Sequence, residues 1–228
     1  MSNNKFLSIF VTVLFACLTS INVNAAGAAA APVESQKGDP AAGEAQAAVC
    51  AGCHGSDGNS PAPSFPKIAG IGEKYITKQL KDIQSGKRAI VEMTGLLDGK
   101  SEQDLKDLAA FYNSKAMQLS GAKPLEVRVN AGIKVDGLEL GARVFRAGNL
   151  ETGVPSCSGC HSPRALGNEP AGYPRLSGQY SEYIAKQLRA FRAGERTNDG
   201  ESRIMRQVAE HMSDAEIDAV ANYISGLN

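Results

Sequence analysis

Two pentapeptides of the form Cys-x-x-Cys-His carry the clearest chemistry in this sequence. The first runs from Cys50 to His54, and the second runs from Cys157 to His161. Two thiols at this spacing can add across the two vinyl groups of one haem, and the adjacent histidine then lies under the iron. The sequence therefore predicts two covalently attached haem c groups. Their anchors and first iron ligands are Cys50, Cys53 and His54, and Cys157, Cys160 and His161.

A Cys-x-x-Cys pair also occurs in redox dithiols, disulfides and zinc sites. A zinc site usually brings its second cysteine pair within about 20 residues. Here more than a hundred residues separate Cys53 from Cys157. A thioredoxin-like motif needs a βαβ setting, and the sequence shows little strand patterning. Haem attachment is favoured over all three alternatives.

Residues 1–25 have the pattern of an export signal. Lys5 supplies a positive start, residues 6–18 are mostly apolar, and Ala25 ends a small-residue cleavage site. The apolar stretch is too short for a convincing membrane span. Cleavage removes Cys17, so the four remaining cysteines all belong to the two motifs. The pattern predicts a periplasmic protein, with lipid attachment at Cys17 as the alternative.

Composition limits the other classes of function. The 228 residues include 24 basic and 24 acidic side chains, and this balance argues against nucleic acid as the main partner. Aromatic residues make up only 6% of the chain, and tryptophan is absent. A covalent haem would fill a core that such side chains fill poorly.

The chain contains an internal repeat. Between residues 65–88 and 173–196, nine of 24 positions are identical, and each copy follows its haem motif at a similar distance. Two copies indicate duplicated domains and not a solenoid. We predict a first haem domain over residues 26–127 and a second over 128–228. The second copy also carries an insertion at about 146–155, to which we assign no role.

Helical patterns recur in both copies. Apolar residues repeat at helical spacing over 75–83 and 183–191, and each pattern ends near a glycine. A last helix in each half begins at a capping-box pattern, at Ser101 and at Ser213. A further helix is expected to begin at Asp39-Pro40. The sequence thus predicts an all-α fold.

The second axial ligand of each iron decides between a carrier and an enzyme, because an open position permits substrate chemistry. Met93 lies eight residues before Ser101, and Met205 lies eight residues before Ser213. This shared register favours both methionines as ligands over the alternative that they are core residues. Met117 and Met212 have no counterparts in the other copy. His211, the one histidine outside the motifs, is expected at the surface.

The environment of each proximal imidazole can also be predicted. Its free N–H should meet a backbone carbonyl, which fixes the ring orientation. The backbone around Pro66 and Pro174, twelve and thirteen residues after the motif histidines, is the expected place. Basic residues recur at matched positions, such as Arg88 and Arg196. Pairing with haem propionates is open for some of them and exposure to solvent is expected for most, so we assign none of them to a site.

Together these features resemble the cytochrome c4 family over essentially the whole mature chain. The resemblance rests on both haem motifs, the Phe/Tyr-Pro-Lys/Arg-x-x-Gly turn, the Tyr-x-x-Lys-Gln-Leu helix and the segments 93–97, 159–163 and 196–200. It implies two tandem class I cytochrome c domains related by a pseudo-twofold axis. It also implies the axial pairs His54/Met93 and His161/Met205.

The resemblance further implies a function. It points to a one-electron carrier of the bacterial respiratory chain that passes electrons toward a terminal haem–copper oxidase. Contacts with redox partners should be transient. We expect a monomer, with peripheral membrane association as a further possibility.

The rival hypothesis is an enzyme such as a dihaem peroxidase. It requires that Met93 or Met205 is not a ligand, and the chain is short for that class. A haem sensor or assembly factor is a third reading that no feature supports. We therefore predict an electron-transfer protein and not an enzyme.

Overall fold

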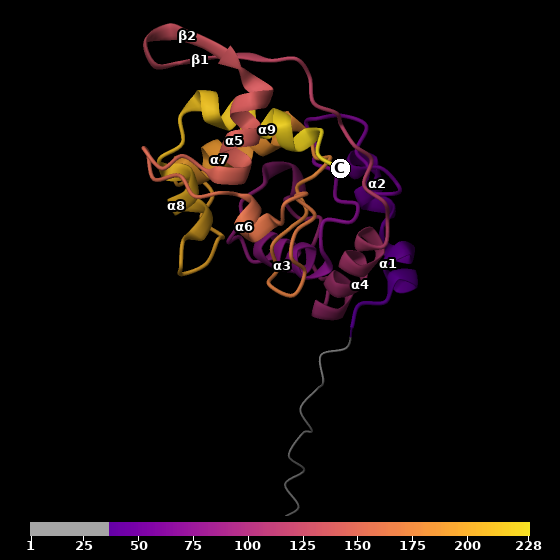
Figure 1. The fold of residues 1–228 in the computed structure, drawn as a ribbon. Helices are drawn as coiled ribbons and strands as arrows, with labels where there is room; N and C mark the ends of the chain where they lie inside the picture. Colours follow the sequence, from indigo (N-terminus) through magenta and orange to yellow (C-terminus); the bar gives the residue numbers. More distant parts are fainter. Residues whose placement is uncertain (1–36) are drawn as a thin grey trace, which may run out of the picture. The chain divides into compact units, whose positions relative to one another are not determined.

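The computed structural model describes residues 37–228, so the predicted signal peptide at 1–25 and the leader up to residue 36 lie outside the described range. The described chain is mostly helical, as predicted (Figure 1). Within it, no helix is both long and apolar enough to cross a membrane. Its elements are α1 (Pro40–Gln46), α2 (Ala48–His54), α3 (Glu73–Gln84), the 3-10 turn η1 (Val91–Met93), α4 (Glu102–Asn113), β1 (Glu126–Val129), the 3-10 turn η2 (Asn130–Gly132), β2 (Ile133–Asp136), α5 (Gly137–Ala147), α6 (Ser158–His161), α7 (Ser181–Arg192), α8 (Ile204–Glu210) and α9 (Asp214–Ser225).

The helix starts follow the capping signals in the sequence. Asp39 caps α1 by accepting a hydrogen bond from the Ala41 N–H, and Pro40 occupies the first helical position. Ser101 and Ser213 each form a complete capping box, with Asp104 in α4 and Glu216 in α9. The repeated helices α3 and α7 have Ser85 and Ala193 as their C-cap residues, and each cap is followed by a glycine with positive φ.

In each half, the first and last helices pack against each other. Helix α1 contacts α4, and α5 contacts α9 (Figure 1). A buried glycine stands at each crossing, Gly43 in α1 and Gly141 in α5. The repeated helices then complete each half, because α3 packs on α4 and α7 packs on α9. The duplicated sequence therefore folds into two equivalent arrangements of helices.

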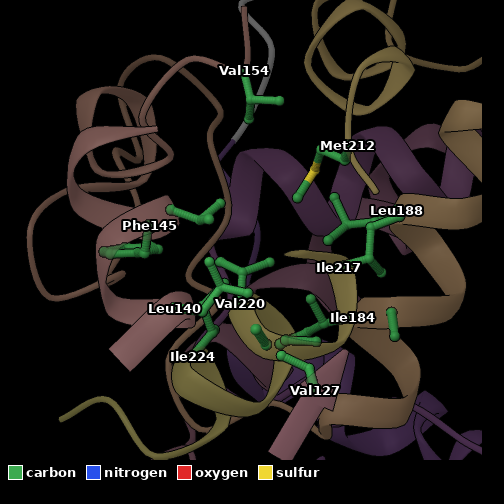
Figure 2. Packing of buried hydrophobic residues seen from close by; sticks show 14 of the residues in the cluster. Val127, Leu140, Phe145, Val154, Ile184, Leu188, Met212, Ile217, Val220 and Ile224 are labelled. Atoms are coloured by element: carbon green, nitrogen blue, oxygen red, sulfur yellow. The ribbon is translucent and has the colours of Figure 1, made fainter. Parts of the chain in front are cut away.

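Each half has its own hydrophobic core. The first cluster includes Ile76, Leu108 and Tyr112, all buried. The second is larger and brings together residues of α5, α7 and α9 (Figure 2). Labelled there are Val127, Leu140, Phe145, Val154, Ile184, Leu188, Met212, Ile217, Val220 and Ile224.

A short β-hairpin is the part of the fold that the sequence did not predict. Strands β1 and β2 are antiparallel, with Glu126 opposite Asp136 and Val129 opposite Ile133. Val127 points into the second core, whereas most other hairpin residues are exposed. The predicted boundary between residues 127 and 128 thus falls inside β1.

The segment that joins the halves lies against the second half. The N–H groups of Ser120 and Gly121 donate to the carbonyls of Gly178 and Ser225, at 3.1 and 3.0 Å. The side-chain amide of Asn222 bonds both the N–H and the carbonyl of Lys123, at 3.0 and 2.8 Å. The connection is therefore short and held in place.

Candidate haem sites

The first haem motif lies on helix α2. This seven-residue helix carries Cys50, Cys53 and His54, and it ends at Gly55, whose φ is 78°. Residues three apart on a helix share a face, so the two thiols lie one above the other. The cysteines and the histidine are all partly buried. The helix therefore presents one attachment face, with the histidine at its end.

The second motif has less helix around it. Helix α6 covers only residues Ser158–His161, and Cys157 is its N-cap. The insertion before it forms a small loop closed by a bridge between Asn149 and Val154. Asn149 also donates to the buried Glu216 carboxylate at 2.8 Å. The loop is thus fixed to α9, and it brings the chain into α6 where the first half uses a longer helix.

Both motif histidines are oriented by a proline carbonyl, as the sequence predicted. His54 Nδ1–H donates to the Pro66 carbonyl oxygen at 2.8 Å, and His161 Nδ1–H donates to that of Pro174 at 2.9 Å. A proton on Nδ1 leaves Nε2 with its lone pair free to bind a metal. Each ring is therefore held in the tautomer that an axial ligand requires.

The protonation of both histidines favours metal binding. Burial lowers the pKa of His54 and of His161, although the hydrogen bond to the proline carbonyl opposes this effect. Because only neutral imidazole binds a metal, a lowered pKa keeps the ligand form available at neutral pH.

The two methionines in register both face the same space as the motifs. A cavity of about 1460 Å³ is lined by both cysteine pairs, both motif histidines, Met93 and Met205. Met117 and Met212 are buried in the two cores instead and do not line it. His211 is exposed at the end of α8, as expected.

The cavity fits two haems. Its volume exceeds the 300–1,000 Å³ that is usual for one small-molecule site. Its wall holds paired thiols for attachment, a nitrogen ligand with a free lone pair, and soft thioether sulfur, the donor set of c-type haem iron. Apolar side chains such as Ile76, Leu108 and Ile184 complete the lining.

Comparison with known proteins decides the family. A family model described as cytochrome c matches the chain twice, over residues 40–115 and 138–228. Cytochrome c4 of Pseudomonas aeruginosa is 50% identical over 191 residues, covering 84% of this chain and 90% of the relative. The chain belongs to the cytochrome c4 family. Cytochrome c4 of Azotobacter vinelandii is 49% identical over 200 residues, again covering 84% of this chain and 90% of the relative.

Solved structures agree with this membership. The crystal structure of reduced recombinant cytochrome c4 from Pseudomonas stutzeri has a TM-score of 0.77 at 46% identity, covering 84% of this chain and all of that one. The cytochrome c4 structure from Acidithiobacillus ferrooxidans has a TM-score of 0.68 at 30% identity, covering 79% of this chain and 99% of that one.

A more distant relative in sequence is a protein of Stutzerimonas stutzeri named thiosulfate dehydrogenase electron acceptor. It is 35% identical, and the match covers 79% of this chain and 80% of the relative.

Membership of the cytochrome c4 family establishes the cofactor and the general activity. The protein carries covalently bound haem c in two tandem cytochrome c domains and acts as an electron-transfer protein. The cysteine pairs Cys50/Cys53 and Cys157/Cys160 fit the two attachment motifs.

Sequence reasoning missed one group of residues on the cavity wall. The matched pairs Tyr75/Tyr183, Gln79/Gln187 and Arg88/Arg196 all line it. These residues repeat in the sequence, where the tyrosines and glutamines indicate a helix face and the arginines a pair of basic positions. Only the fold shows that the three residues of the first half contact those of the second.

Proposed function

We propose that this cytochrome c4 family member is a periplasmic one-electron carrier that delivers electrons toward a terminal haem–copper oxidase. In this proposal residues 26–127 and 128–228 are the two haem domains. His54 with Met93, and His161 with Met205, are the axial pairs. The observation that carries the proposal is that each half presents one oriented histidine and one methionine to a common cavity.

The residues support transfer without rearrangement. When bound, haem c supplies an iron that exchanges one electron. The Pro66 and Pro174 carbonyls hold the histidine rings, and the capping boxes at Ser101 and Ser213 fix the helices that follow each methionine. Thioether is a soft ligand and favours the reduced metal, so a methionine ligand raises the reduction potential. A fixed ligand set on both sides keeps the structural change on electron transfer small.

The axial pairs can be tested by spectroscopy on protein matured with its haem-attachment machinery. We expect two haems per chain by pyridine haemochrome, and a far-red methionine-to-iron band at full strength for both. Met93→Ala and Met205→Ala should each remove half of this band, lower one potential and allow carbon monoxide to bind that haem. Met117→Ala and Met212→Ala, in the cores, should keep the band. A band that survives in Met93→Ala or Met205→Ala would refute the ligand assignment.

The partner can be tested separately. Reduced protein should be reoxidised by membranes that contain a haem–copper oxidase, and cyanide should stop this reoxidation. Relatives named thiosulfate dehydrogenase electron acceptor make such a dehydrogenase the donor to try first. No cyanide-sensitive reoxidation would exclude the oxidase as the acceptor. The contact should be transient and salt-dependent, as is usual for redox partners.

A further inference from the structure

Matched residues of the two halves meet in a closed ring of hydrogen bonds. Arg88 of the first half donates to Gln79 Oε1 of its own half at 2.9 Å. It also reaches into the second half, where it donates to the Tyr183 hydroxyl at 3.0 Å and to Gln187 Oε1 at 3.2 Å.

Arg196 of the second half makes the mirrored contacts. It donates to Gln187 Oε1 at 2.7 Å in its own half. Across the junction it donates to the Tyr75 hydroxyl and to Gln79 Oε1, both at 3.1 Å. Each guanidinium therefore contacts the same three side-chain positions, with the halves exchanged, and both arginines share the two glutamine oxygens.

The acceptors in this ring are neutral. Two positive charges are held by the amide oxygens of Gln79, Gln187 and Asn198 and by two phenol oxygens. Asp82 is the carboxylate beside the ring, and it accepts hydrogen bonds from Lys78 and Asn198. Like charges brought together in a partly buried site repel, and this repulsion is reduced when an anion binds between or beside them.

The two guanidinium groups interact with the acidic groups around them. Burial works against the charge on Arg88, but Tyr183, Tyr75 and the Asp82 carboxylate outweigh it and raise the pKa of the guanidinium. Burial would raise the pKa of the Tyr75 hydroxyl, yet Arg196 and Arg88 lower it. The ring therefore favours negative charge at its surface.

The arginines face the space in which the two haems bind. Both line the 1460 Å³ cavity together with the tyrosines and glutamines of the ring. A guanidinium has five N–H donors. Within residues 37–228 the Arg88 side chain makes three hydrogen bonds and the Arg196 side chain makes four, so each keeps at least one N–H group for another acceptor. Planar carboxylates are the acceptors that guanidinium geometry fits best.

We propose that Arg88 and Arg196 form one carboxylate-binding element shared by both haem sites, which binds haem propionates and raises the reduction potentials of both irons together. Reduction adds negative charge, so a nearby fixed positive charge favours the reduced state. Because both arginines line the one cavity that contains both haem motifs, the charge of each acts on both sites. This inference rests on the two bound haems and not on the axial methionines or the partner.

The test compares Arg88→Gln and Arg196→Gln by spectroelectrochemistry of both haems. Each variant should lower both midpoint potentials, with up to about a tenfold fall in the reduced-to-oxidised ratio at fixed applied potential, or about 59 mV for one electron. Arg88→Lys, which keeps the charge, should stay closer to the native potentials. The matched control is Arg128→Gln, an exposed arginine on β1 outside the cavity. The proposal is overturned if only the haem of the same half responds, or if the shift equals that of the control.

Resonance Raman spectroscopy supplies a direct readout. The propionate bending modes should shift in both glutamine variants and stay unchanged in Arg128→Gln. If the glutamine variants do not retain two haems, the native protein still decides, because propionates bound to N–H groups should shift on exchange into D₂O. An absent shift there overturns the proposal. Failure of the axial assignment would instead appear in the far-red band, which is independent of these modes.

Discussion

Gly43 lies so close to α4 that a Cβ atom on it would stand 2.0 Å from the Asp107 carbonyl oxygen. Gly141 has the same relation to α9, where the Cβ would stand 2.2 Å from the Ala219 carbonyl oxygen. In both halves the obstacle is backbone and cannot rotate away. The glycines therefore allow the first and last helices of each half to cross in contact.

Replacing either glycine by alanine should separate this crossing. We expect Gly43→Ala and Gly141→Ala to destabilise their halves by roughly 1–3 kcal/mol or more, because overpacking against backbone forces the helices apart. Thermal unfolding followed by circular dichroism measures the loss. Glu44→Ala, on the exposed face of α1, is the control and should unfold close to the native temperature. An unchanged midpoint in both glycine variants would contradict the close crossing.

A second pair of equivalent positions should respond unequally. Gly58 and Ala165 both have positive φ, 77° and 54°, and the carbonyl of each accepts two backbone hydrogen bonds from its proline turn. A Cβ on Gly58 would stand 2.9 Å from both the Ala69 backbone nitrogen and Tyr112 Cδ1, whereas the second half has Ile224 at the position of Tyr112. The smaller side chain leaves room for the methyl group of Ala165.

We therefore expect Gly58→Ala to cost about 1–2 kcal/mol from left-handed backbone alone, with the contact at Tyr112 adding to it. Ala165→Gly should change stability by less than about 1 kcal/mol, because relief of strain offsets added chain entropy. Denaturant titration of both variants measures the difference. Stability changes of equal size in Gly58→Ala and Ala165→Gly would show that the side chain at position 112 or 224 does not determine whether a methyl group is tolerated.

The loop before Met205 depends on an ion pair. The Asp199 carboxylate, almost fully buried, accepts from Arg206 Nε at 2.8 Å and from the Arg206 N–H at 2.9 Å. Asp199→Ala would leave Arg206 without this partner and free the loop. The far-red band of the second haem should then disappear at a lower temperature than in the native protein. Val91→Ala, at an exposed position two residues before Met93, should leave both bands unchanged, and a native melting profile in Asp199→Ala would count against the role of the pair.

Acid stability should depend in part on Glu216. Burial alone would raise the pKa of its carboxyl, but hydrogen bonds from Asn149 and Ser213 outweigh this and lower the pKa. A lowered pKa means that the stabilisation is complete above the ordinary value of 4.5 and is lost as the pH falls through the folded-state pKa. Glu216→Gln should therefore lose less stability than the native protein between about pH 5 and pH 3. Glu44→Gln should follow the native curve, and parallel curves for Glu216→Gln would refute the assignment.

The features that were predictable from the sequence are those set by local chemistry. The capping boxes at Ser101 and Ser213 depend on residues three apart, and the structure shows both. The carbonyls at Pro66 and Pro174 follow from the short distance in sequence to each histidine. The duplication then placed Met93 and Met205 in register, and both line the cavity with the haem motifs.

What the sequence did not show depends on contacts between distant segments. The hairpin of β1 and β2 has two strands of four residues, half of them charged and most of them exposed, so little in them indicates a packed strand. The ring of Arg88 and Arg196 joins residues 95 to 121 positions apart, and it exists only because the two copies face each other. The residue pattern within one copy does not indicate which of its side chains contact the other copy.

The short connection along residues 114–125 reduces the binding free energy that the ring must supply to keep the two halves together. Two separate proteins that met through a few hydrogen bonds would dissociate, since each such bond contributes only about 1 kcal/mol net. A short tether instead sets an effective concentration in the millimolar range or above. Because Ser120, Gly121 and Lys123 are bonded to the second half, little chain is left free to move. The halves can therefore stay together through the hydrogen bonds of a polar junction, and that junction can hold charged groups beside the haems.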